Sequence, residues 1–564
     1  MKGTFTMKTG RGIAILLAAA ATVPLVLAGA DRPSIAAVPA SHADEASTVR
    51  RITEPQYRRA ITDIFGADIK VVGRFEPDLR VDGLLAVGTS AVSITSGGLE
   101  QYETIARNIA EQVVAPDHRA SLIGCTPAAA DPAGSACAGQ VFDRLGLRML
   151  RRPLAPAERA ALVATTLESA RALGDFHAGL AAALTGLLTS PDFLFRIDRP
   201  GAPEQGRRMV DGWSKASRLS FFLWNAPPDE MLLAAAAKGE LDRPEARARL
   251  VATMIASPRF ADGVRAFFSD FLHLDDIDLL AKDARIYPAF SSAVAADARE
   301  QTLRTITDLL VDRQGDYRDL FTTRRIAMNR TLGPLYDVPV AERGWTFHQF
   351  PDGDPRAGLF TQISFLAQHS HPGRTSPTLR GKAIQEILLC ETIPAPPANV
   401  NFAVVQDVDN PTLKTTRARL QAHLDDEECA SCHKLTDPMG LALEKFDGAG
   451  QFRTTEHGEA IDTTGSFADT HFDGAAALGR LFQRNPQPID CLVQSTWRYA
   501  MGRRLAAFDK PVVARLNADF AGTGYRMVDL IRAIALSPQF YEYEPASPPA
   551  RMAGWPALAT KGAM

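Results

Sequence analysis

Apolar residues recur at helical spacing along most of the chain. In the first such segment they fall three and four positions apart, on one face of a predicted helix: Tyr57, Ala60, Ile61, Ile64 and Phe65. Thr53 precedes this face as an N-cap, and Gln56, three residues later, completes a capping box. We therefore expect the first helix to begin directly after Thr53.

The same spacing predicts further helices at 99–114, 141–152 and 180–188, and residues 207–335 are almost continuously helical in pattern. The strict alternation that is typical of strands is rare. The pattern therefore predicts a mainly α fold with a multi-part helical architecture.

Changes in composition divide the chain into segments. An Ala/Pro/Ser-rich stretch follows the N-terminal apolar run, and polar turns interrupt the helical patterns from about residue 350. We expect a signal peptide at 1–30, a disordered tether at 31–47, an N-terminal helical domain at 48–116, a helical domain at 117–200, a central helical domain at 205–340, a turn and cysteine-motif region at 350–455, a C-terminal helical domain at 470–545 and a disordered tail at 546–564.

The N-terminus has the three parts of a secretory signal peptide. Lys2, Lys8 and Arg11 form a basic region, residues 13–28 are apolar, and cleavage is expected near Ala30. The apolar run is short for the alternative, an uncleaved membrane anchor, and no later stretch approaches the roughly 20 apolar residues of a membrane span. We therefore expect a periplasmic or secreted protein with no membrane span after cleavage.

The formal net charge of the chain is −3, and removal of the basic leader makes it more negative. Nucleic-acid binding needs a basic face, so the composition argues against a nucleic-acid partner.

Cys429-Ala430-Ser431-Cys432-His433 matches C-x-x-C-H, the attachment motif of c-type haem. The two thiols, one helical turn apart, bond to the haem vinyl groups, and His433 is the proximal iron ligand. The alternatives are a chance match, a dithiol redox pair or half a zinc site, but zinc requires a second nearby pair and the chain has no second C-x-x-C. We predict one covalent haem c in a C-terminal haem region of the helical architecture.

The remaining cysteines are even in number, as expected in an oxidising compartment. Cys125 and Cys137 bracket a short polar loop, which predicts a local disulfide. Cys390 and Cys491 are predicted to form a second disulfide across the haem region, the alternative being two buried free thiols.

Several ordered motifs resemble one large exported bacterial family: Arg51-x-Thr53…Tyr57, Arg152-Pro153-Leu154, 218–224, His371-Pro372-x-Arg374-Thr375-Ser376-Pro377-x-x-Arg380-Gly381, Cys429-x-x-Cys432-His433-x-x-x-Asp437-Pro438-x-Gly440 and Asp447-Gly448-x-Gly450. This family is abundant in Planctomycetes and consists of consecutive domains of unknown function with a cytochrome c-type haem motif. The similarity covers nearly the whole mature chain. It implies a haem c protein of the cell envelope that serves redox chemistry, without naming a substrate.

The sequence does not assign the sixth ligand of the haem iron. Met/His ligation suits electron transfer, but a methionine on an apolar helix more often fills a core. The candidates are His371, Met501, Met439, His369 and His423, and a site without a protein ligand is a further alternative. Arg374 and Arg380 are candidates for pairing with the haem propionates, because guanidinium matches carboxylate bidentately; the alternative for both is a salt bridge within the protein.

These observations favour periplasmic electron transfer with a protein redox partner. The first alternative is a haem-dependent oxidoreductase or peroxidase acting on an unknown substrate, and the second is a structural envelope protein with an incidental C-x-x-C-H. The chain shows no G-x-S-x-G, P-loop, H-E-x-x-H or Rossmann motif, which argues against a haem-independent enzyme. Whether the protein is an enzyme is left open by the sequence.

Overall fold

A computed structural model describes residues 48–128, 131, 133–204, 206–395, 403–424 and 427–543. These residues belong to one compact unit. The predicted signal peptide, tether and tail lie outside the described residues.

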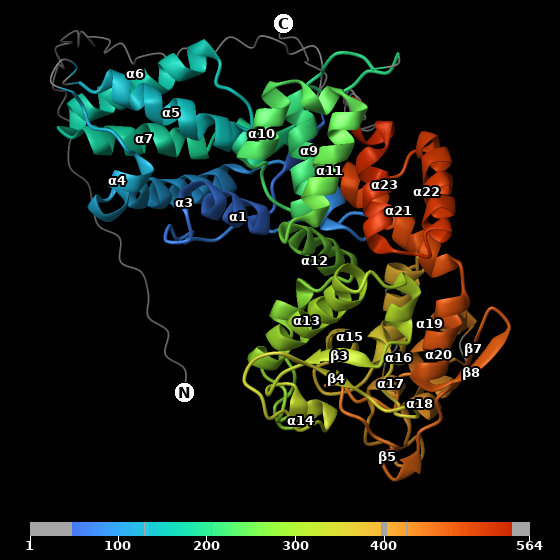
Figure 1. Cartoon of the computed structure of the whole chain (residues 1–564). Helices are drawn as coiled ribbons and strands as arrows, with labels where there is room; N and C mark the ends of the chain where they lie inside the picture. Colours follow the sequence, from blue (N-terminus) through green and yellow to red (C-terminus); the bar gives the residue numbers. More distant parts are fainter. Residues whose placement is uncertain are drawn as a thin grey trace, which may run out of the picture. The chain divides into compact units, whose positions relative to one another are not determined.

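The structure is mainly α-helical, as predicted (Figure 1). The N-terminal elements are β1 (Val49–Arg51), α1 (Glu54–Phe65), α2 (Leu85–Gly88), α3 (Ser96–Val114), α4 (Pro116–Leu122), α5 (Ser135–Leu150), α6 (Pro156–Leu173), α7 (Phe176–Leu188), α8 (Pro191–Leu194) and β2 (Phe195–Ile197). The central elements are α9 (Gly212–Trp224), α10 (Glu230–Ala237), α11 (Pro244–Ala256), α12 (Arg259–Phe271), α13 (Ser292–Thr307), β3 (Arg325–Met328), α14 (Gly333–Tyr336) and β4 (Thr346–Gln349).

The remaining elements include the cysteine motif and the C-terminal helices. They are α15 (Ile363–Gln368), α16 (Pro377–Ala383), α17 (Ala403–Gln406), α18 (Thr416–His423), α19 (Glu427–Leu441), β5 (Thr455–Glu456), β6 (Glu459–Ala460), β7 (Thr464–Phe467), β8 (Thr470–Asp473), α20 (Gly474–Arg484), α21 (Gln487–Met501), α22 (Lys510–Gly522) and α23 (Met527–Leu536). Among the described residues the strands pair only as two-stranded antiparallel ribbons, β1–β2, β3–β4, β5–β6 and β7–β8.

The predicted start of the first helix is confirmed. The Thr53 side chain accepts a hydrogen bond from the Gln56 amide, and the Gln56 side chain accepts one from the Thr53 amide. The predicted apolar face of α1 is buried.

The helical pattern predicted for 207–335 is interrupted in the structure. No regular α-helix lies between the end of α12 at Phe271 and the start of α13 at Ser292, and 325–328 form strand β3. The interruption contains Pro288 and four aspartates, Asp275, Asp276, Asp278 and Asp283, and such residues favour turns over helix interiors.

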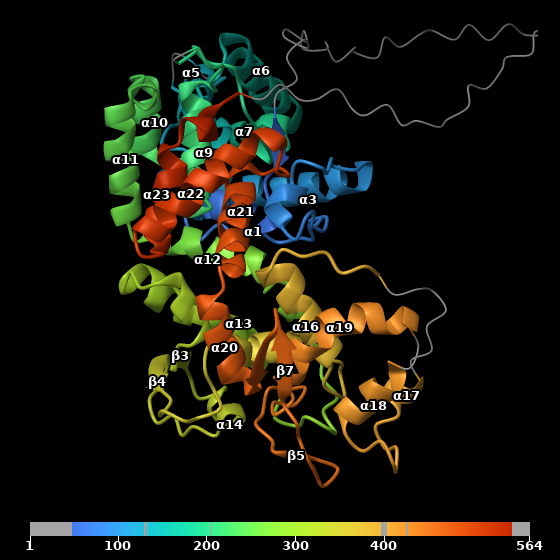
Figure 2. The same ribbon diagram turned by 90° about the vertical axis from the view of Figure 1, so that its right-hand side faces the viewer.

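The C-terminal helices pack against the central ones rather than forming a separate layer. α23 contacts α11, and α21 contacts both α9 and α12; Figure 1 and Figure 2 show these helices side by side. Their side chains share one hydrophobic core that also includes residues of α15, α16 and α19. A second core joins α1, α3, α5 and α7.

Both predicted disulfides are confirmed. Cys125 bonds to Cys137, and Cys390 bonds to Cys491 across 101 residues of sequence. The second disulfide therefore connects the end of the α16 segment to α21.

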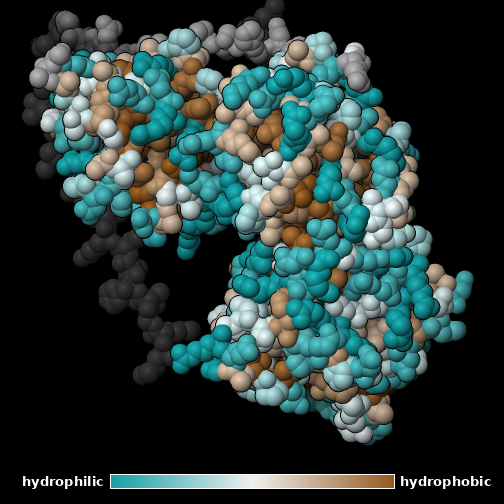
Figure 3. Space-filling model, viewed as in Figure 1, coloured by the Kyte–Doolittle hydropathy of each residue, from teal (hydrophilic) through white to brown (hydrophobic). Residues whose placement is uncertain are grey.

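No helix in the described ranges has the length and hydrophobicity needed to cross a membrane. The face of the molecule in Figure 3 is mainly hydrophilic, with scattered apolar areas between the helices.

Candidate functional site

The cysteine motif lies in helix α19. Cys432 and His433 are both partly exposed, whereas the side chains of Cys429 and His423 lie outside the described part of the chain. Among the described side chains, His433 and its neighbours define the geometry of the motif.

The His433 ring is oriented by a carboxylate one helical turn later. Its Nδ1 lies 2.8 Å from Oδ2 of Asp437, and the two side chains are 14% and 5% exposed. A carboxylate accepts hydrogen bonds, so Nδ1 carries the proton and the lone pair of the neutral imidazole is on Nε2. This is the tautomer that a histidine needs to ligate a metal through Nε2.

Asp437 is held in turn by helix α16. Thr378 of α16 donates a hydrogen bond of 2.8 Å to Oδ1 of Asp437, and the neighbouring Thr436 hydroxyl lies 3.2 Å from the same oxygen. A chain of hydrogen bonds thus runs from Thr378 through Asp437 to His433. It fixes the ring from a second helix.

Two glycines allow α16 and α19 to approach closely (Figure 2). A Cβ at Gly381 of α16 would lie 1.8 Å from the Thr436 carbonyl oxygen, and a Cβ at Gly440 of α19 would lie 1.8 Å from the Pro377 carbonyl oxygen. Neither position has room for any side chain. The backbones therefore touch at both points, and this contact brings Thr378 to Asp437.

Arg380, one of the two arginines considered for the haem propionates, is fully buried. Its guanidinium donates to the carbonyl oxygens of Leu443, Phe446, Leu366 and Asp447 at 2.7–3.3 Å and pairs with Glu444 at 3.4 Å. Burial lowers the pKa of Arg380, and Glu444 opposes that shift. The side chain connects α15 and α16 to the segment that follows α19.

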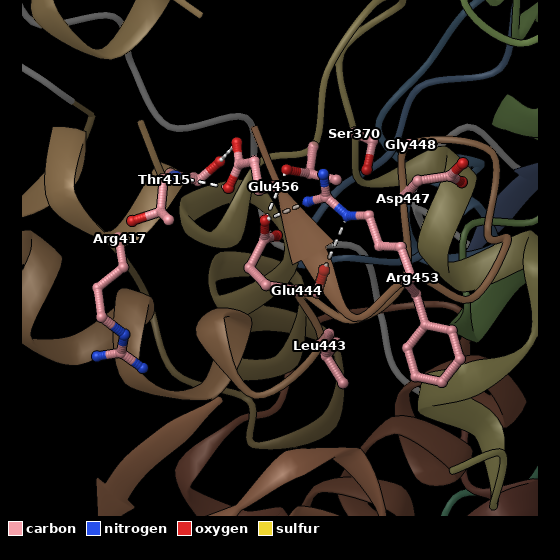
Figure 4. A network of polar contacts seen from close by, with 12 residues as sticks. Ser370, Thr415, Arg417, Leu443, Glu444, Asp447, Gly448, Arg453 and Glu456 are labelled. Carbon is pink, nitrogen blue, oxygen red and sulfur yellow. Dashed lines mark hydrogen bonds and ion pairs between the residues drawn. The ribbon is translucent and has the colours of Figure 1, made fainter. Parts of the chain in front are cut away.

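Glu444 belongs to a polar network beside α19 (Figure 4). Its carboxylate accepts hydrogen bonds from Arg453 at 3.0 Å and from Thr375 at 2.8 Å. Burial raises the pKa of Glu444, although Arg380 and Arg453 act in the opposite direction. The network holds the turn before α16, which contains Thr375, against the end of α19.

A second carboxylate, Glu456, anchors helix α18. It accepts from the Thr416 amide at 2.7 Å and pairs with Arg419 at 2.8 Å. Burial alone would raise the pKa of Glu456, but these donors outweigh it and lower the pKa. The helix that precedes the cysteine motif is thus attached to strand β5.

Arg374, the other propionate candidate, differs from Arg380 in its surroundings. No hydrogen bond or ion pair connects its guanidinium to the described part of the chain. Burial and the charge of Arg419 lower the pKa of Arg374, and burial and Arg374 in turn lower the pKa of the half-buried His371. The turn before α16 therefore carries positive charge that has no carboxylate partner among the described residues.

Lys282 fixes the backbone of the turn that contains the two candidate histidines. Its ammonium group donates to the carbonyl oxygens of Ala367, Ser370 and His371 at 2.7–3.1 Å. Burial, with a smaller contribution from Arg380, lowers the pKa of Lys282 to about 7. The His369 ring packs edge-to-face on Phe365, with the ring centroids 4.8 Å apart, and burial lowers the pKa of His369 to about 3.

Met439 and Met501 are buried in the main hydrophobic core. Met439 lies on α19 and Met501 ends α21. The structure gives both a core environment, and the prediction of a distal ligand stays open among the five candidates.

Two residues of the site carry no prediction from the sequence, Thr378 and Asp437. The spacing of four between His433 and Asp437 is the available signal, because residues i and i+4 of a helix lie on the same face. Thr378 has no such signal, since it reaches the site from another helix.

Five family models match the chain in succession, each described as a protein of unknown function: DUF1587 at 50–115, DUF1595 at 137–198, DUF1592 at 210–338, DUF1588 at 356–456 and DUF1585 at 468–540. The chain belongs to the multidomain family built from these domains. The predicted succession of domains of unknown function is therefore confirmed. The model over 356–456, which includes α16 and α19, is named PSCyt3, a cytochrome-associated name. No curated protein and no solved structure matched the chain.

The close helix contact leads to a stability prediction. Gly440→Ala is expected to destabilise the fold by about 1–3 kcal/mol or more, because the added methyl must displace a backbone carbonyl. Gly186→Ala is the matched control: this glycine is also helical, but a Cβ there meets nothing within 4 Å, so the change should be neutral or stabilising by up to about 1 kcal/mol. Denaturant unfolding followed by circular dichroism measures both. Equal stability of the two variants would contradict the close contact.

Proposed function

We propose that this chain is an exported c-type haem protein that transfers electrons in the cell envelope. Haem would be bound covalently through Cys429 and Cys432, with His433 as the proximal ligand. The observation that carries the proposal is the hydrogen bond between His433 and Asp437, which puts the lone pair of the imidazole on Nε2. When bound, haem supplies a one-electron redox centre.

Three further features support the proposal. The charge of Arg374, which has no carboxylate partner among the described residues, suits a propionate, whereas the Arg380 guanidinium already binds Glu444 and four carbonyl oxygens. The cytochrome-associated family model covers the stretch with the motif. The two disulfides fit a protein that matures in an oxidising compartment, where a protein redox partner would exchange electrons with it.

A second candidate function is a haem-dependent oxidoreductase or peroxidase. The same His433–Asp437 contact favours it, because a carboxylate partner makes the imidazole a stronger donor to the iron. What separates the two functions is the sixth coordination position: a filled site favours electron transfer, and an open site favours reaction with a small oxidant or substrate.

Covalent haem is tested by expressing the protein in cells with a haem c maturation system and measuring the pyridine haemochrome. We expect one haem per chain that resists extraction, and loss of that haem in the Cys429→Ala/Cys432→Ala variant. The Cys125→Ala/Cys137→Ala variant is the control, because it also removes two cysteines but leaves the motif intact. A wild-type protein without a haemochrome would overturn the proposal and support the structural envelope protein.

The sixth ligand is tested by absorption spectra of the reduced protein with and without carbon monoxide. Electron transfer predicts a low-spin spectrum that carbon monoxide does not change. Single substitutions of His371, Met501, Met439, His369 and His423 then identify the ligand as the one whose loss produces a high-spin spectrum. A wild-type protein that is high-spin and binds carbon monoxide would reject electron transfer as the main role and favour the second candidate.

Asp437 is expected to tune the iron. Asp437→Asn removes the negative charge beside His433, so the imidazole becomes a weaker donor and the reduction potential should rise by about 60 mV, the equivalent of a tenfold change in relative affinity for oxidised iron. Redox titration measures it. Asp409→Asn, which removes an exposed carboxylate, should leave the potential unchanged. A potential that is the same in Asp437→Asn and the wild type would rule out this role.

A further inference from the structure

A cavity of about 150 Å³ lies among the helices away from the cysteine motif. Its walls come from α1, α2, β2, α9, α12, α13 and α21, and none of its lining residues belongs to α19. Four of the five matched domains contribute to it. Ligand sites are often found where domains meet.

Arg196 is the lining residue whose charge is not matched by the protein. Its guanidinium makes no hydrogen bond or ion pair with the described residues, and its Nε is buried without a partner. It stacks on Phe221, with the guanidinium carbon 4.6 Å from the ring centroid. Burial, together with the charge of Arg50, lowers the pKa of Arg196 well below its usual value. A guanidinium whose Nε is buried without a hydrogen-bond partner among the described residues carries a cost in folding free energy.

The strand pairing makes that cost larger. Arg196 of β2 is directly opposite Arg50 of β1, and like charges opposite each other destabilise a ribbon. The nearby carboxylate, Asp198, is already shared by Arg50 at 3.0 Å and Arg218 at 2.8 Å. Three arginines therefore surround one carboxylate. The arginine that is left without an ion pair among the described residues is Arg196, which lines the cavity.

Tyr499 adds a second unused donor. Its hydroxyl has no hydrogen-bond partner among the described residues, and its ring packs edge-to-face on Phe267 with the centroids 5.3 Å apart. Burial raises the pKa of Tyr499, and the residue lines the cavity together with Arg196 and Asp270. Arg196 and Tyr499 thus present donors to the same space.

Each acidic residue of the cavity wall is held in an ion pair within the protein. Asp270 pairs with Arg80 at 2.7 Å and accepts from the amides of Leu85 and Ala86, and Asp275 also pairs with Arg80. Asp78 pairs with Arg51 at 3.0 Å. These carboxylates are committed, so a bound cation would find no free acceptor among them.

We propose that this cavity binds a small organic carboxylate, whose oxygens accept hydrogen bonds from Arg196 and Tyr499. The remaining walls include apolar side chains, those of Leu85, Ala86, Phe221, Phe222 and Ala266. An inorganic anion would leave these walls in contact with water, whereas a carboxylate with a compact apolar body covers them. The site does not depend on the proposed haem.

The test is calorimetric titration of the full chain with benzoate, butyrate, benzamide and sulfate. At least one of the two carboxylates is expected to bind saturably, and Arg196→Gln should weaken that binding by about tenfold or more, the loss typical of a charged hydrogen bond. Tyr499→Phe should weaken it by a smaller factor. Benzamide, which has nearly the shape of benzoate but no charge, and sulfate should each bind at least tenfold more weakly.

Arg299→Gln is the matched control, because Arg299 lines the same cavity but is engaged by Asp278 and Ser269. It should leave carboxylate binding unchanged. Arg196→Gln should also unfold at the same or a higher temperature than the wild type, since it removes a charged group whose Nε is buried without a partner among the described residues. Failure of both carboxylates to bind, equal binding to wild type and Arg196→Gln, or equally tight binding of sulfate would overturn the proposal.

Discussion

The contact between α16 and α19 is the constraint on which the candidate site depends. Gly381 and Gly440 remove the side chains that would separate the two backbones, and the resulting approach puts Thr378 within reach of Asp437. Without it, the carboxylate would lose its support from a second helix and His433 would be oriented from α19 alone. The two glycines therefore determine the geometry of the imidazole although neither touches it.

Buried arginine side chains connect irregular segments of the chain by donating hydrogen bonds to their backbone carbonyl oxygens. Arg380 donates to carbonyl oxygens on both sides of α19, and Arg356 donates to the carbonyl oxygens of Thr361, Leu335 and Gly450. Irregular segments bury carbonyl groups that need donors, and one guanidinium supplies several in a fixed plane. In these loops the arginine side chains thus supply the hydrogen-bond donors that backbone amides supply in helices and strands.

Sequence reasoning reached the helical fold, the α1 capping box and both disulfides, because each depends on local spacing or on pairing of a few cysteines. It could not tell which of Arg374 and Arg380 is engaged within the protein. Arg380 is bonded to backbone carbonyl oxygens, and such contacts leave no signal in the sequence. It also overestimated helix between α12 and α13, where acidic residues and Pro288 form turns. Relations between helices, such as Thr378 with Asp437, require the packed structure.

The disulfide between Cys390 and Cys491 closes a covalent ring around the cysteine motif. While the chain is still unfolded, four thiols are available in this stretch, and they allow three different pairings. Cofactor attachment to Cys429 and Cys432 would remove two of them and leave one correct partner for each of the others. If such attachment precedes disulfide formation, the ring can close only in its native connectivity, whereas the reverse order would allow a disulfide that includes a cysteine of the motif.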